Sequence, residues 1–190
     1  MKPNNVKLLA IVGMSGSGKS VAVDYLAAKG IPKVHFGNMI YQEMAKRGIE
    51  RTPDGKSEKA FREMIRETEG QDWVGRQAIA ETKDLIAAGQ KRIVLDGLYS
   101  WTEYRLFLHE FPGAMTVVAV VMPRALRYER VSKRPDRAFD IQAIRERDFG
   151  EIEKLEKGGP IAIADYYILN DGNITELEQR LDAILKSIDF

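Results

Sequence analysis

The chain has 190 residues, 44% of them hydrophobic, with a formal net charge of +1 and no cysteine. This length and composition suit a single domain with a real core, and the missing cysteine excludes disulfides and thiol chemistry and fits a reducing cytoplasm. The near-neutral charge argues against nucleic acid or an anionic membrane as a partner, and no stretch reads as a secretory signal or membrane span.

The first half of the chain alternates short apolar runs with helical patterns. The predicted elements are, in chain order, a strand at Lys7–Val12, a helix at Ser20–Lys29 closed by Gly30, a strand at Val34–Phe36, and helices at Met39–Arg47, 58–69 and 73–88. The first strand is apolar at nearly every position, which is typical of a strand buried on both faces. The three consecutive helices predict a helical lobe, residues 38–90, inserted between the second and third strands.

The second half returns to strands separated by helices. The predicted elements are a strand at Arg92–Asp96, a strand at Met115–Met122, a helix that Pro123 opens and that stops before Pro135, a helix that Asp140 caps and that ends at Gly158, a strand at Tyr166–Leu169, and a last helix with Thr175 and Glu178 as its capping box. Strands alternating with helices predict a three-layer α/β fold, with a mostly parallel five-stranded sheet covered on both faces.

The most specific motif is a phosphate-binding loop between the first strand and the first helix. The segment from Gly13 to Ser20 matches G-x-x-x-x-G-K-[ST], and its position after a strand and before a helix is the context that this motif requires. Glycines let backbone N–H groups surround the phosphates, and the helix N-terminus adds partial positive charge. We therefore expect a P-loop NTPase fold that binds ATP with Mg²⁺. The candidate nucleotide-binding residues of the loop are Gly13, Ser15, Gly16, Ser17, Gly18, Lys19 and Ser20.

Within this site Lys19 is expected to reach the β- and γ-phosphates, and the Ser20 hydroxyl to bind Mg²⁺. Asp96 ends the third strand, at the sheet edge where ligands gather in such folds. It is a candidate partner of the Mg²⁺-bound water, or a base for an acceptor hydroxyl. The alternative is a turn aspartate before Gly97.

Motifs elsewhere in the sequence distinguish between a GTPase, a motor ATPase and a kinase. The sequence has no N-K-x-D guanine reader, and Gly97 stands where a motor ATPase carries a water-activating glutamate after Asp96. Phosphoryl transfer instead needs positive charge on the migrating group and a lid that excludes water. We predict such a lid at residues 124–140, because arginines recur there at helical spacing: Arg124, Arg127, Arg130, Arg134 and Arg137.

If the helix persists to Arg134, the first four arginines lie on one face. Arg134 and Arg137, nearest the lid tip, are the candidate catalytic arginines, and Arg130 is a candidate nucleotide ligand. The alternative for the whole stripe is a solvated helix face.

Taken together, these residues resemble the P-loop kinases of nucleotides and coenzymes, the group of adenylate kinase and dephospho-CoA kinase. The likeness is closest to an uncharacterised dephospho-CoA-kinase-like family and covers most of the chain. The motifs that carry it are the P-loop, Gly37-Asn38 after the second strand, Asp96-Gly97, Arg147-Asp148-x-x-Glu151, and the segment from Ala164 to Asn170. In this context we expect Asp148 to pair with an arginine.

The resemblance implies ATP as donor, a nucleotide-like acceptor under the helical lobe, and an adenine that lies against Asn170 and Gly172. Two departures concern the acceptor. Asn38 replaces an aspartate that serves the acceptor hydroxyl in dephospho-CoA kinases, and Tyr99 lies where the family pattern has an arginine. Acceptor contacts are therefore expected from Gly37, Asn38, Tyr99 and the lobe arginines Arg62 and Arg66, with Arg76 as a further candidate.

The predicted function is phosphoryl transfer from ATP to a small nucleotide-like acceptor, by a monomer or homodimer. Dephospho-CoA kinase proper is one alternative, with Asp96 as base. A second is a nucleotide-sensing module that turns over little ATP, and a third is a kinase acting on a nucleic-acid base or end. His35 and His109 have no metal-ligand partners at useful spacing, so no zinc site is expected.

Overall fold

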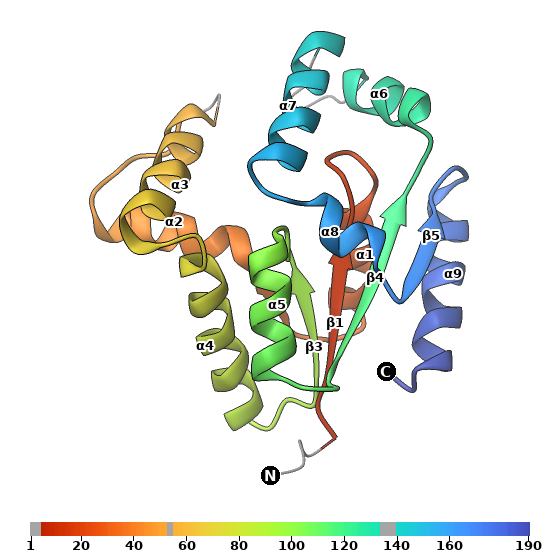
Figure 1. Ribbon diagram of the computed structural model, residues 1–190. Helices are drawn as coiled ribbons and strands as arrows, with labels where there is room; N and C mark the ends of the chain where they lie inside the picture. Colours follow the sequence, from red (N-terminus) through yellow and green to blue (C-terminus); the bar gives the residue numbers. More distant parts are fainter. Residues whose placement is uncertain (1–4, 53–54, 134–139) are drawn as a thin grey trace.

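The computed structural model describes residues 5–52, 55–133 and 140–190 (Figure 1). Five strands form one sheet in the order β2-β3-β1-β4-β5, and every neighbouring pair is parallel. The strands are β1 (Lys7–Val12), β2 (Lys33–His35), β3 (Arg92–Asp96), β4 (Met115–Val121) and β5 (Tyr166–Leu169). The predicted α/β fold of the P-loop NTPase type is confirmed, and the sheet is all-parallel rather than mostly parallel.

Helices cover both faces of this sheet. They are α1 (Lys19–Ala28), α2 (Phe36–Lys46), α3 (Lys56–Glu69), α4 (Trp73–Ala87), α5 (Trp101–Glu110), α6 (Arg124–Ser132), α7 (Ile141–Glu153), α8 (Gly158–Ala162) and α9 (Ile174–Ser187). Alternate residues of β1 face the two sides: Leu8 packs in a core with α2, α4 and α5, and Leu9 in a core with α1 and α9. This two-sided burial explains the continuous apolar run in the sequence.

Three helices, α2 to α4, lie between β2 and β3, where the inserted lobe was predicted. Figure 1 shows all strands pointing toward the same edge of the sheet. There α3 stands on one side and α6 and α7 stand on the other. The P-loop follows β1 at this edge, so the chain places its functional motif between two groups of helices.

Four details differ from the sequence prediction. Helix α5 was missed, although Ser100 and Glu103 form the capping box that begins it. Helix α2 begins at Phe36 rather than Met39, which puts Gly37 and Asn38 in its first turn.

Helix α7 is capped by Asp140 as predicted, but it ends at Glu153, and the short α8 follows separately. The capping box at Thr175 was wrong, because Asn173 caps α9 through the Glu176 N–H.

Within the described residues, none of the helices combines the length and the apolar character that a membrane span requires.

Candidate functional site

The P-loop is a tight turn between β1 and α1 that only glycine can form at key positions. Gly16 and Gly18 have φ of +86° and +104°, in the left-handed region. A Cβ on Gly18 would lie 2.1 Å from the Asn170 side-chain nitrogen, which itself donates to the Ser17 carbonyl at 2.8 Å. The loop is thus fixed against the end of β5, and its conformation is set by packing.

Lys19 begins α1, and its ammonium donates to the Met14 carbonyl at 2.9 Å, so its side chain curls back over the loop. Burial and, after it, the positive charge of Lys157 lower the pKa of Lys19, and the negative charges of Glu151 and Asp96 raise it; the net pKa is about 7. Ser20 lies exposed in the first turn of α1. Lys19 and Ser20 therefore stand where a P-loop holds phosphate and metal.

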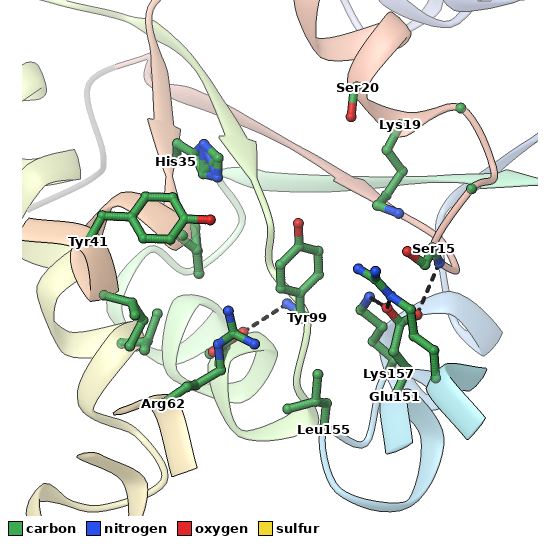
Figure 2. A pocket seen from close by; sticks show the side chains of 18 of the residues that line it. Ser15, Lys19, Ser20, His35, Tyr41, Arg62, Tyr99, Glu151, Leu155 and Lys157 are labelled. Atoms are coloured by element: carbon green, nitrogen blue, oxygen red, sulfur yellow. Dashed lines mark hydrogen bonds and ion pairs between the residues drawn. The ribbon is translucent and has the colours of Figure 1, made fainter. Parts of the chain in front are cut away.

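A pocket of about 340 Å³ opens beside the loop (Figure 2). One wall is the P-loop and start of α1, contributing Ser15, Gly16, Gly18, Lys19 and Ser20. The facing wall comes from β2, α2, α3 and the segment after β3, contributing His35, Gly37, Tyr41, Arg62, Arg66 and Tyr99 among others. The third wall is α7 and the segment after it, with Arg147, Glu151, Leu155 and Lys157. The pocket therefore joins the phosphate loop to the helices between β2 and β3.

Most of the predicted acceptor residues lie in this pocket. Gly37, Arg62, Arg66 and Tyr99 line it, whereas Asn38 is exposed on α2 and does not. The Arg66 side chain is 11% exposed, lies 3.8 Å from Glu103, and its Nε has no hydrogen-bond partner within the described residues. Burial lowers the pKa of Arg66. The Arg66 guanidinium therefore lies in the pocket wall beside Glu103, with its Nε buried.

Tyr99 also lies in the pocket, and burial raises the pKa of its phenol far above the ordinary value, with the charge of Asp96 adding to the effect. Tyr99 is therefore a neutral ring and hydroxyl at physiological pH.

Asp96 ends β3 in register with Ile11 of β1, as its predicted role requires. Its carboxylate is 16% exposed and lies 3.6 Å from the His35 Nδ1. Asp96 does not itself line the pocket, although His35 does. Asp96 therefore contacts the pocket residue His35 but does not line the pocket.

The arginine stripe of α6 is used for contacts within the protein. Arg127 is buried and pairs with both carboxylate oxygens of Asp148 on α7, and it also donates to the Ser15 carbonyl at 3.0 Å. The predicted arginine partner of Asp148 is confirmed. Helix α6 ends at Ser132, and the prediction that the stripe continues to Arg134 falls outside the described residues.

Arg130 donates to the backbone carbonyls of Asn170 and Gly172 at 3.1 and 2.8 Å. Three residues predicted at the nucleotide therefore contact one another beside the P-loop, although none of them lines the pocket. The two predicted catalytic arginines, Arg134 and Arg137, lie outside the described residues.

Glu151 and Lys157 are among the pocket residues that were not predicted as site residues. Glu151 accepts a hydrogen bond from the Ser15 N–H at 3.0 Å and pairs with Lys157 at 2.9 Å, and both side chains are 7% exposed or less. Burial raises the pKa of Glu151, but Lys157 and the Ser15 N–H outweigh it, and the net pKa is below the ordinary value. Glu151 had a sequence signal in the Arg147-to-Glu151 motif, whereas Lys157 had none.

The donor set fits Mg²⁺ in the way that P-loop proteins use it. Among the described residues, no group of three or more acidic or histidine side chains could hold a metal alone. Mg²⁺ in nucleotide sites takes one or two protein oxygens and completes its shell with phosphates and water. Ser20, in the first turn of α1, and Asp96, the last residue of β3, stay the candidate ligands.

Comparison with known proteins agrees with this architecture. An AAA domain model matches residues 9–156. The solved structure of a shikimate kinase from Bacteroides thetaiotaomicron superimposes with a TM-score of 0.59 at 9% identity, covering 97% of this chain and 99% of the other. A dephospho-CoA kinase from Campylobacter jejuni gives a TM-score of 0.56 at 15% identity, covering 97% and 98%.

In sequence, the chain is 35% identical over 185 residues to a UPF0200 protein of Thermococcus onnurineus, covering 95% of this chain and 97% of the relative. The P-loop fold implies nucleotide binding. The chain belongs to the UPF0200 family and to the AAA domain family.

Proposed function

We propose that this protein is an ATP-dependent kinase that transfers the γ-phosphoryl group to a small nucleotide-like acceptor. The observation that carries the proposal is the pocket that reaches from the P-loop to Arg62 and Arg66 of α3. Phosphoryl transfer needs donor and acceptor in one enclosed space, in line with each other. A hydrolase needs only the donor end and a positioned water.

The donor end is the P-loop. Its N–H groups and the N-terminus of α1 would hold the triphosphate, and Lys19 would turn from the Met14 carbonyl to the β- and γ-phosphates. Ser20 and Asp96 would hold Mg²⁺, directly or through water. Mg²⁺, when bound, neutralises charge on the β- and γ-oxygens.

The acceptor end is cationic and partly aromatic. Arg62 and Arg66 both line the pocket, and Arg62 has no ion-pair partner within the described residues. The rings of Tyr41 and Tyr99 line the same region, and a cation, Arg51 or Lys157, lies over one face of each ring. Aromatic rings of this kind can pack on a base. These features favour an acceptor that carries an anionic group and a ring, and they support the nucleotide-like class. The near-neutral chain favours a small molecule over a nucleic acid.

The position of Asn38 bears on the acceptor atom. Asn38 is exposed, outside the pocket, and an amide cannot take a proton, so it is not the base for a hydroxyl acceptor. An acceptor phosphate needs no such base. If the acceptor is a hydroxyl, Asp96 stays the candidate base, and because Asp96 does not line the pocket a rearrangement would have to bring its carboxylate there.

The test is an ATP-consumption screen with Mg²⁺ across nucleoside monophosphates, nucleosides and dephospho-CoA. We expect transfer to one acceptor, abolished in Lys19→Ala and retained in Lys46→Ala, which removes an exposed lysine of α2. The product should carry one more phosphate by mass spectrometry.

The outcomes separate the alternatives. Transfer to dephospho-CoA alone would identify dephospho-CoA kinase proper, with Asp96→Asn then expected to lose activity. ATP binding without turnover on any acceptor would favour the nucleotide-sensing module. A chain that does not bind ATP refutes the proposal.

A further inference from the structure

A carboxylate of the chain itself, that of Glu151, is bound to the P-loop in this structure. The Ser15 N–H donates to Glu151 at 3.0 Å, across 136 residues of sequence (Figure 2). Backbone N–H groups of such loops bind phosphate oxygens when nucleotide is present. A carboxylate that accepts from one of them occupies part of the place of a phosphate.

Glu151 is in turn held by Lys157. Their charged atoms are 2.9 Å apart, the two side chains are 7% and 6% exposed, and the Lys157 backbone N–H donates to the Glu151 carbonyl at 3.1 Å. A buried charge is costly unless an opposite charge or strong hydrogen bonds compensate it. Lys157 can therefore leave Glu151 only for another anion that enters the same pocket.

The surroundings of Lys157 keep its ammonium in the pocket. It lies 4.3 Å from the centre of the Tyr99 ring, an attractive arrangement for a cation. Figure 2 shows Lys19 extending from the other side toward Glu151 and Lys157. Both lysines line the pocket, and Lys157 is the positive charge that lowers the pKa of Lys19 most. Because both ammonium groups line one pocket, an anionic group that enters the pocket is attracted by both.

We propose that Lys157 is a second lysine for the terminal phosphate of the bound nucleoside triphosphate, and that Glu151 holds this position until nucleotide displaces it. The inference rests on the proposed ATP binding and adds to it a residue outside the P-loop and outside the arginine stripe. When nucleotide binds, the γ-phosphate replaces Glu151 as the acceptor of the Ser15 N–H and forms an ion pair with Lys157. A diphosphate lacks the group that reaches Lys157.

The experiment compares the affinity of the full chain for Mg²⁺ with a non-hydrolysable ATP analogue and with ADP, by calorimetry. In Lys157→Met we expect the triphosphate to bind about 10- to 100-fold more weakly, the effect of one charge-assisted contact, with ADP changed by less than about threefold. Lys157→Arg should restore most of the preference for triphosphate. Glu151→Gln should bind the triphosphate more tightly, because the displaced group no longer carries charge.

The matched control is Lys154→Met, which removes an exposed lysine of the same segment, 67% exposed and 3.7 Å from Glu63. It should change neither affinity. Lys157→Met removes the buried partner of Glu151 and leaves it the more exposed Arg147 at 3.4 Å and the Ser15 N–H. The double variant Lys157→Met/Glu151→Gln is therefore measured as well, and its affinities test the inference if the single variant unfolds.

Equal loss for triphosphate and ADP in the Lys157 variants, or no loss for either, overturns the inference while leaving the proposed function in place. If the unmodified chain binds neither nucleotide, the proposed function itself fails.

Discussion

The buried ion pair between Arg127 of α6 and Asp148 of α7 should be among the most sensitive interactions in the protein. The two side chains are 7% and 10% exposed, the guanidinium meets both carboxylate oxygens, and the Tyr128 hydroxyl donates to the same carboxylate at 3.0 Å. Asp148→Ala leaves Arg127 buried with the Ser15 carbonyl as its remaining hydrogen-bond acceptor.

Removing one partner of such a pair costs about 3–5 kcal/mol, because the other charge stays buried without compensation. For a chain of this size each kcal/mol lowers the melting temperature by about 2–4 °C, so we expect a fall of about 6–20 °C. The double variant Arg127→Met/Asp148→Leu removes both charges and should recover most of the loss. Circular dichroism during thermal and urea unfolding measures both.

The control lies on the same helix. Lys133 and Glu129 form an exposed pair, 72% and 57% exposed, and Glu129→Gln should cost less than about 1 kcal/mol. If Asp148→Ala is no more destabilising than Glu129→Gln, or if the double variant is worse than the single one, the reasoning from burial is refuted.

Two further predictions concern the loop and the C-terminal helix. Gly18→Ala should lower the free energy of unfolding by about 1–3 kcal/mol or more, because a Cβ at φ +104° would lie 2.1 Å from the Asn170 side chain. Gly30→Ala should lower it by less, because Gly30 has φ +81° but open space around it. Chemical denaturation of the two variants measures the difference. The hydrogen bond from the Tyr25 hydroxyl, at 2.7 Å, lowers the pKa of Asp182, with Lys29 adding to it, so this stabilisation is complete above about pH 4 and lost as pH falls through the folded pKa. Wild type should therefore exceed Asp182→Asn in melting temperature at pH 6, and this difference should shrink as the pH falls through the folded-state pKa of Asp182. A difference that stays constant as the pH is lowered contradicts the assignment.

The fold was predictable from the sequence because its signals are local. A parallel strand covered on both faces must be apolar throughout, and the apolar run from Leu8 to Val12 indicates such a strand. Helix α5 was missed for the opposite reason. Its inner face carries Tyr104 and Phe107 among charged residues, so the apolar periodicity is weak. The capping box at Ser100 is a short motif that by itself does not predict a helix.

The candidate site was predictable only where one segment carries the whole motif. The P-loop meets that condition. The α6 arginines do not, because helical spacing tells which residues share a face but not what packs against them, and Arg127 faces the buried Asp148. The role proposed for Lys157 could not be predicted from local sequence patterns. It depends on the ion pair with Glu151 and on the contact of Glu151 with Ser15, which is far away in the sequence.

The residue Ser15 links these observations, because both of its backbone polar groups are taken by the helices after β4. Its carbonyl accepts from Arg127, and its N–H donates to Glu151. A bound nucleotide does not displace Arg127 from the Ser15 carbonyl, because a phosphate does not bind a carbonyl oxygen. The peptide between Ser15 and Gly16 is planar and trans, so fixing the carbonyl toward α6 points the Gly16 N–H away from it. Arg127 thus orients a loop donor permanently, whereas Glu151 holds the neighbouring donor only until an anion replaces it. Loss of Arg127 should therefore weaken ATP and ADP alike, in contrast to loss of Lys157.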